Sequence, residues 1–128
     1  MNDSNNPILM IEADNLTKRY GRHTAVANLT FSCGPGEIVG FLGPNGAGKT
    51  STMRILTGYM PPSEGDAYIA GYHTVDESLQ ARQQLGYLPE TVPLYPEMTV
   101  EGYLHFMGRV RRLENVWDRV DDVLEAVD

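Results

Sequence analysis

The chain has 128 residues, of which 41% are hydrophobic and 21% are charged. This length suits one domain with one buried core, and the composition excludes wholesale disorder. The net charge of −7 is uneven: residues 1–60 carry five Lys/Arg and four Asp/Glu, whereas residues 61–128 carry five and thirteen. The acidic second half argues against a broad nucleic-acid-binding surface, so we expect no nucleic-acid partner.

No apolar run approaches the roughly 20 residues that a membrane helix needs, so we expect a chain that is soluble by itself. The polar N-terminus lacks the features of a signal peptide, and residues 1–9 are interpreted as a tail. A single cysteine, Cys33, fits a reducing, cytosolic setting, and its apolar surroundings predict a small buried side chain. His23, His73 and His105 show no metal-ligand spacing.

The first third of the chain predicts two antiparallel strands in a hairpin. Apolar and polar residues alternate over Leu9–Leu16 and again over Ala25–Ser32, where every second residue from Ala25 to Phe31 falls on one face. The polar segment Thr17–His23 between them predicts a turn. Ile38–Leu42 is apolar throughout, which favours a strand buried on both faces, as in a parallel sheet.

The rest of the chain alternates between helix and strand signals. In chain order these predict a helix at Lys49–Thr57, a strand at Ala67–Ala70, a helix at Val75–Gln84 and a strand at Leu85–Leu88. A proline-rich loop follows, and Thr99 is suited to capping a helix from Val100 to about Arg111. Asn115 or Asp118 begins a last helix, whose apolar stripe still runs where the chain stops.

The segment that carries chemistry reads Gly-Pro-Asn-Gly-Ala-Gly-Lys-Thr and matches the phosphate-binding loop of nucleoside triphosphatases. Its glycines let backbone amides turn inward as an anion nest, and the following helix adds a positive field. Lys49 supplies a charge to the outer phosphates, Thr50 a hydroxyl to magnesium, and Ser51 a hydroxyl within reach of an inner phosphate. The predicted binding residues are Gly43, Pro44, Asn45, Gly46, Ala47, Gly48, Lys49, Thr50 and Ser51. The alternative is a glycine-rich strand-to-helix turn with an incidental lysine.

From about Met10 to the end, the sequence resembles the ATP-binding subunits of ABC transporters. Besides the phosphate loop, the resemblance rests on Leu56-Thr57-Gly58, Pro62-Ser63-Glu64-Gly65 and Gly86-Tyr87-Leu88-Pro89. Leu16–Gly21 resembles the aromatic loop of the family, which implies that Tyr20 stacks on adenine. The alternative for Tyr20 is a half-exposed aromatic at a strand end. Stacking predicts that phenylalanine at this position retains most of the ATP affinity, whereas alanine loses affinity.

Glu90 departs from the family pattern, which usually places a glutamine after Tyr-Leu-Pro. The resemblance implies that Glu90 is a catalytic group and, with Thr50, a magnesium ligand. The alternative is a surface carboxylate in a loop. Because the stretch Pro93–Val100 looks like a branch of bacterial exporter ATPases, we interpret Glu90 as a native variant.

The resemblance implies an α/β P-loop NTPase fold of ABC type that is incomplete. An N-terminal antiparallel β portion leads into a core strand, the P-loop and a helix, with a domain over residues 10–128 whose helical subdomain begins near residue 99 and is truncated at residue 128. It implies ATP and Mg²⁺ as cofactors. In the intact parent it implies ATP hydrolysis that powers transport by a transmembrane permease partner, a second ATP-binding domain arranged head to tail, and a cytoplasmic place at the inner face of the membrane.

A Leu-Ser-Gly-Gly-Gln-type signature, an Asp-Glu strand end and a switch histidine do not occur in the sequence. Since phosphoryl transfer depends on positioning and charge stabilisation, we expect little or no turnover from these 128 residues. Three other functions stay open: a small kinase or GTPase, a soluble ABC-type ATPase of DNA repair or translation, and a non-catalytic nucleotide-binding interaction module.

Overall fold

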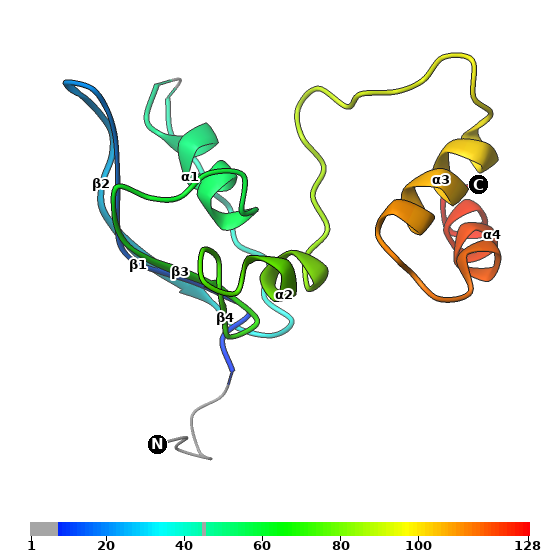
Figure 1. Ribbon diagram of the computed structural model, residues 1–128, viewed down its shortest axis with the longest axis horizontal. Coiled ribbons are helices and arrows are strands. Elements are labelled where there is room, and N and C mark those ends of the chain that lie inside the picture. The colour runs from blue at the N-terminus through cyan, green and yellow to red at the C-terminus, as the bar shows by residue number, and fades with distance from the viewer. Residues whose placement is uncertain (1–7, 45) are drawn as a thin grey trace. The chain divides into compact units, whose positions relative to one another are not determined.

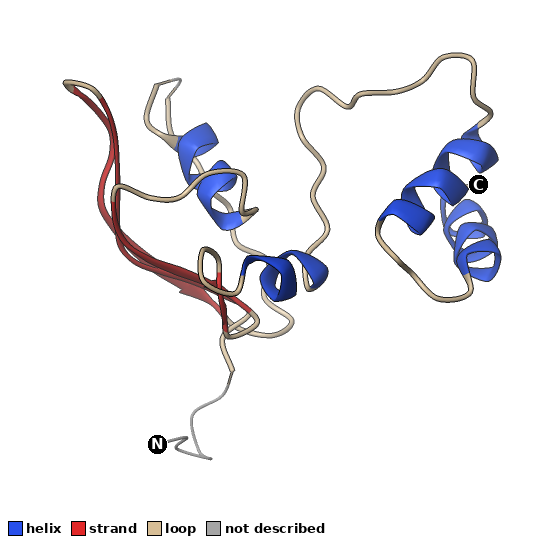
Figure 2. Ribbon diagram, viewed as in Figure 1, coloured by secondary structure: helices blue, strands red, loops and turns tan. Residues whose placement is uncertain are grey.

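The computed structural model describes residues 8–44 and 46–128. The chain divides into two compact units, Met1–Tyr87 and Leu88–Asp128, and each is described by itself. The first unit contains strands and helices and the second contains helices, as Figures 1 and 2 show. Residues 1–7 of the predicted tail and Asn45 of the phosphate loop lie outside the described residues.

The first unit is built on a four-stranded antiparallel sheet. Its strands lie in the order β2-β1-β3-β4, with β1 at Ile11–Tyr20, β2 at His23–Cys33, β3 at Glu64–Ile69 and β4 at Tyr72–His73. The predicted hairpin is confirmed, but its turn is shorter than Thr17–His23, since Tyr20 pairs directly with His23. Pairing depends on backbone hydrogen bonds, so polar side chains at the hairpin end do not stop it.

Two asparagines interrupt the β1–β2 ladder. Asn15 and Asn28 have φ angles of 50° and 49°, and the register shifts between Ala13 and Leu16 and again between Leu16 and Lys18. An extra residue in one strand moves the following side chains to the other face. For this reason the predicted alternation in β2 is wrong at its start: Val26 is buried and Ala27 is exposed.

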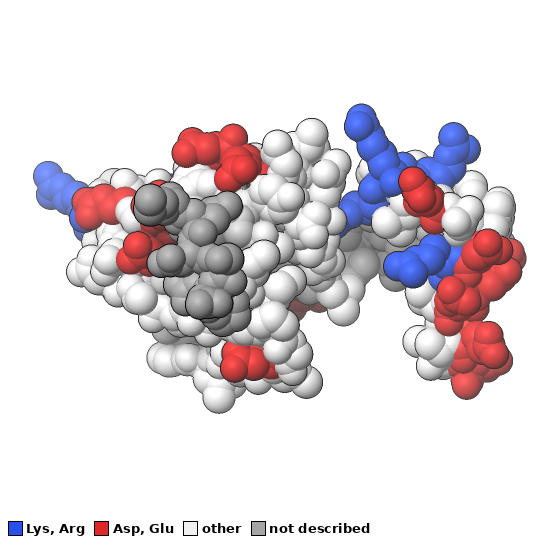
Figure 3. Space-filling model, turned by 90° about the horizontal axis from the view of Figure 1, so that it is seen from below, with Lys and Arg blue, Asp and Glu red and all other residues white. Residues whose placement is uncertain are grey.

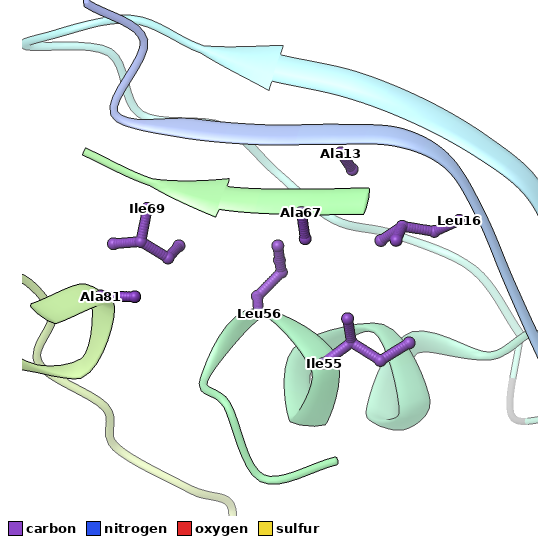
Figure 4. Close-up of a cluster of buried hydrophobic side chains, with 7 residues drawn as sticks. All are labelled: Ala13, Leu16, Ile55, Leu56, Ala67, Ile69 and Ala81. Atoms are coloured by element: carbon purple, nitrogen blue, oxygen red, sulfur yellow. The ribbon is translucent and has the colours of Figure 1, made fainter. Parts of the chain in front are cut away.

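One face of the sheet is covered by α1 (Lys49–Leu56) and α2 (Ser78–Gln83), as Figure 4 shows from the side chains between them. Leu16 and Ile55 are 0% exposed at its centre. The cluster consists of Ala13, Leu16, Ile55, Leu56, Ala67, Ile69 and Ala81. Alanines on the strands let the helices approach the sheet closely. This core fixes α1, and with it the loop that enters the helix.

The predicted strand at Ile38–Leu42 does not form. Ile38 and Leu42 are almost fully exposed, although Phe41 packs on Phe31 with ring centroids 5.6 Å apart. A strand needs hydrogen-bonding neighbours. Among the described residues, the paired strands are β1 with β2, β1 with β3 and β3 with β4, all antiparallel, and Ile38–Leu42 is in none of these pairs. The predicted strand Leu85–Leu88 fails for the same reason, with Leu85 packing on the core as an irregular segment.

The second unit consists of α3 (Val100–Val110) and α4 (Val116–Val127) after an irregular loop. Thr99 caps α3 as predicted, its hydroxyl oxygen accepting from the Gly102 amide at 3.0 Å. The predicted start of the last helix is confirmed at Asn115, which takes the N-cap position. His105 stacks on Trp117 with ring centroids 4.0 Å apart, which joins the two helices. Figure 3 shows acidic side chains gathered on the surface of this unit, and α4 contributes several of them.

Candidate functional site

The phosphate-loop sequence forms a tight bend between β2 and α1. The Ala47 amide donates to the Pro44 carbonyl oxygen at 3.1 Å, and the Lys49 ammonium donates to the Gly43 carbonyl oxygen. Gly46 and Gly48 have φ angles of 86° and 90°, in the left-handed region that favours glycine. The side chain of Lys49, near the end of the loop, is thus bonded to Gly43 at its start.

Gly48 lies where β2 comes closest to the loop. A Cβ atom at this position would stand 2.2 Å from the Ala25 carbonyl oxygen and 2.8 Å from Cγ2 of Val26. Only glycine fits against the strand backbone here. The close approach connects the loop to the same sheet that carries Tyr20 at the end of β1.

The N-terminus of α1 opens at this loop with its amides uncapped by any side chain. Gly48 occupies the N-cap, and the first turn contains no acidic residue. The first amides of a helix have no intrahelical acceptors, and together with the helix dipole they favour an anion. Buried Thr52 strengthens the turn through a hydrogen bond of 2.9 Å from its Oγ1 to the Gly48 carbonyl oxygen.

A pocket of about 370 Å³ joins these groups to the aromatic side chain predicted from the sequence. Six of the predicted site residues line it: Tyr20, Gly46, Gly48, Lys49, Thr50 and Ser51. Gly43, Pro44 and Ala47 build the loop without lining the pocket, and Asn45 lies outside the described residues. Sequence reasoning missed His23 and Ala25, which also line it. The hairpin register pairs His23 with Tyr20, and Ala25 lies where β2 meets Gly48 of the loop.

Tyr20 is 44% exposed, and its ring is oriented by contacts at both the face and the hydroxyl. The Lys18 ammonium lies 5.5 Å from the ring centroid and donates to the Pro61 carbonyl oxygen at 2.9 Å. The Tyr20 hydroxyl lies 3.1 Å from Oγ of Ser51 and 3.2 Å from the sulfur of Met60. The aromatic end of the pocket is thus connected directly to α1.

Glu90 does not line this pocket. It belongs to the second unit, where it is exposed in the loop before α3. Over residues 8–44 and 46–128, no three His, Cys, Asp or Glu side chains are grouped to hold a metal ion. No helix in the described part of the chain has the length and apolar character to cross a membrane.

Comparison with known families gives a match to the model described as ABC transporter, over residues 26–128. The chain belongs to the ABC transporter family. It is 38% identical, over 92% of its length, to the linearmycin resistance ATP-binding protein LnrL of Bacillus subtilis, of which the match covers 39%. It is 42% identical over 80% of its length to the Nod factor export ATP-binding protein I of Ralstonia nicotianae, covering 32% of that protein. The chain thus spans well under half the length of these curated relatives.

Solved structures agree with this family membership. An ATP-binding subunit of an ABC transporter superposes with a TM-score of 0.75 and 34% identity, over 83% of this chain and 44% of that one. The dimeric ATP-binding cassette MJ0796, in a post-hydrolysis state bound to ADP and Pi, superposes with a TM-score of 0.74 and 25% identity. That match covers 91% of this chain and 56% of the cassette. The predicted fold class, an α/β P-loop NTPase of ABC type, is confirmed for the part present.

Proposed function

We propose that the pocket of the first unit binds ATP together with Mg²⁺. The observation that carries this proposal is the composition of one pocket, which is lined by an aromatic residue, a lysine, an uncapped helix N-terminus and two hydroxyls. Nucleoside triphosphates have the matching parts, a flat base and a chain of anionic phosphates. The groups that suit the phosphates, Lys49 and the first amides of α1, come from one continuous stretch of the chain.

At the phosphate end, Lys49 has the capacity to serve both its own loop and a ligand. An ammonium group has three protons, and one of them is donated to the Gly43 carbonyl oxygen. The other two are available to phosphate oxygens while the first keeps the loop closed. The uncapped amides of α1 add their donors at the same place.

At the base end, Tyr20 offers a partly exposed ring to an adenine. Stacking of a base on an aromatic side chain contributes about 1–3 kcal/mol. The Lys18 ammonium and the Met60 sulfur hold the ring in one orientation, which reduces the entropy that stacking has to overcome.

We assign the Thr50 hydroxyl, which belongs to a residue lining the pocket, as a ligand of Mg²⁺, a hard cation that prefers oxygen ligands. Bound Mg²⁺ neutralises phosphate charge, which strengthens binding of a triphosphate over a monophosphate. We assign Glu90 the role of a second oxygen ligand and catalytic group in the whole protein, in place of the glutamine that the family usually carries.

For the whole protein we propose ATP hydrolysis that drives transport by a membrane permease. Two relatives named for linearmycin resistance and Nod factor export support an exporter role. The dimeric cassettes among the solved structures support pairing with a second ATP-binding domain. The proposal places the chain at the cytoplasmic face of a membrane, held by its permease.

Lys49→Ala tests the binding proposal. The substitution should weaken ATP binding at least about tenfold, or about 1.4 kcal/mol, measured by titration calorimetry with Mg²⁺ present. The matched control is Arg54→Ala, which removes the same charge from the last turn of α1, outside the pocket. Equal ATP affinity in the Lys49 variant and the control would refute the site.

A further inference from the structure

Three side chains form a short hydrogen-bonded chain that begins at the wall of the pocket: Ser51 on α1, Tyr20 on β1 and Met60 after α1. The distances are 3.1 Å from Ser51 Oγ to the Tyr20 hydroxyl oxygen and 3.2 Å from that oxygen to the Met60 sulfur. Ser51 and Tyr20 line the pocket, whereas Met60 does not. Met60 is partly buried and packs against the core of the first unit.

Counting protons gives this chain a direction. A thioether sulfur has no proton, so Tyr20 must be the donor to Met60. A phenol has only one proton, so in the other contact Tyr20 is left as the acceptor and Ser51 as the donor. The single proton of Ser51 is therefore directed at Tyr20 while this chain is formed.

A phosphate oxygen at the pocket competes for the same proton, because it can only accept at Ser51. We propose that Met60 is a positioning residue of the nucleotide site: by accepting from Tyr20, it turns the Ser51 proton away from the phosphates. The arrangement is a latch, Ser51–Tyr20–Met60, that a ligand must open. This inference depends on the proposed function, since it takes Ser51 as a phosphate-binding hydroxyl.

The latch separates two roles of Tyr20. Tyr20 lines the pocket, where its ring is available to a base. Its hydroxyl determines the direction in which the Ser51 hydroxyl proton points. Met60→Leu removes the acceptor while nearly conserving volume, a change that packed positions tolerate well. The Tyr20 proton can then turn to Ser51 Oγ, which frees the Ser51 proton for an anion. Tyr20→Phe frees the same proton and keeps the ring.

The test uses the full chain and inorganic tripolyphosphate with Mg²⁺, titrated by calorimetry. This ligand has no base, so ring stacking makes no contribution to its affinity. Met60→Leu and Tyr20→Phe should each bind tripolyphosphate about two- to fivefold more tightly than the wild type, the range expected for releasing one partly exposed hydrogen bond. Met53→Leu is the matched control, because Met53 lies on α1 and does not line the pocket.

A background of Ser51→Ala distinguishes the latch from a general effect on packing. The gain from Met60→Leu should vanish in that background, since no Ser51 proton remains to be released. A gain that persists without Ser51, or a Met60 variant no tighter than the Met53 control, overturns the latch. If Lys49→Ala weakens binding while Met60→Leu leaves the affinity for tripolyphosphate unchanged, the latch is refuted and the proposed function stands. If the wild type binds neither ATP nor tripolyphosphate, the proposed function fails and the latch with it.

Discussion

The two units of this chain differ in how completely they enclose their apolar side chains. The first has a cluster of seven buried residues between the sheet and its helices, with Leu16 and Ile55 fully enclosed. In the second, within Leu88–Asp128, only Gly108 and Val120 are buried, and large apolar side chains such as Phe106 and Trp117 stay exposed. The candidate site belongs to the enclosed unit, which fits its need for a backbone held in fixed geometry.

Two closely packed glycines, Gly48 in the first unit and Gly108 in the second, make the contrast testable. Gly48 meets the backbone of β2, which cannot move without disturbing the sheet. Gly108 meets a side chain instead, with Val116 Cγ1 at 2.7 Å from a Cβ built at this position. A clash with backbone should therefore have the larger effect.

Gly48→Ala should have the largest effect, lowering the free energy of unfolding by about 3 kcal/mol. The estimate combines about 1–2 kcal/mol for a left-handed alanine with about 1–3 kcal/mol for overpacking against Ala25. Urea denaturation of the first unit measures it. The matched control is Gly36→Ala, which shares a positive φ of 75° but has nothing within 4 Å of the added Cβ. Equal losses at Gly48 and Gly36 would show that the contact with β2 is not tight.

Gly108→Ala should lower stability by about 1 kcal/mol, confined to the second unit. Overpacking of about 1–3 kcal/mol is partly offset by the better helix propensity of alanine. Hydrogen exchange should quicken at α3 and α4 and stay unchanged in the strands. Adding Val116→Ala removes the clashing methyl group, so the double variant should recover part of the loss relative to Gly108→Ala. Protection that drops equally in both units would contradict separate units.

The same contrast explains what the sequence could and could not predict. The cap at Thr99 and the start of a helix at Lys49 depend on neighbours within a few residues, and both form as predicted. The segment Ile38–Leu42 was predicted from its apolar run, but an apolar run gives no information about the strand beside it.

Long-range details of the site were also out of reach. The irregularities at Asn15 and Asn28 determine which side chains face the core. A single asparagine within a strand pattern does not predict such an irregularity. The contact of Tyr20 with Ser51 joins residues 31 positions apart. The family resemblance assigns a role to the ring of Tyr20 and predicts nothing about its hydroxyl. Distance along the chain, more than chemistry, limited the prediction.

Glu90→Gln should have the smallest effect, changing ATP affinity by less than about twofold, as expected for an exposed position outside the pocket. The reason is that glutamine keeps an oxygen ligand for Mg²⁺ at position 90, while the residues that line the pocket all belong to the first unit. Glu97→Gln, in the same exposed loop, is the matched control for loss of charge. A large loss of affinity at Glu90 alone, measured with Mg²⁺ present, would mean that nucleotide binding needs the negative charge of Glu90 and that an oxygen ligand at this position is not sufficient.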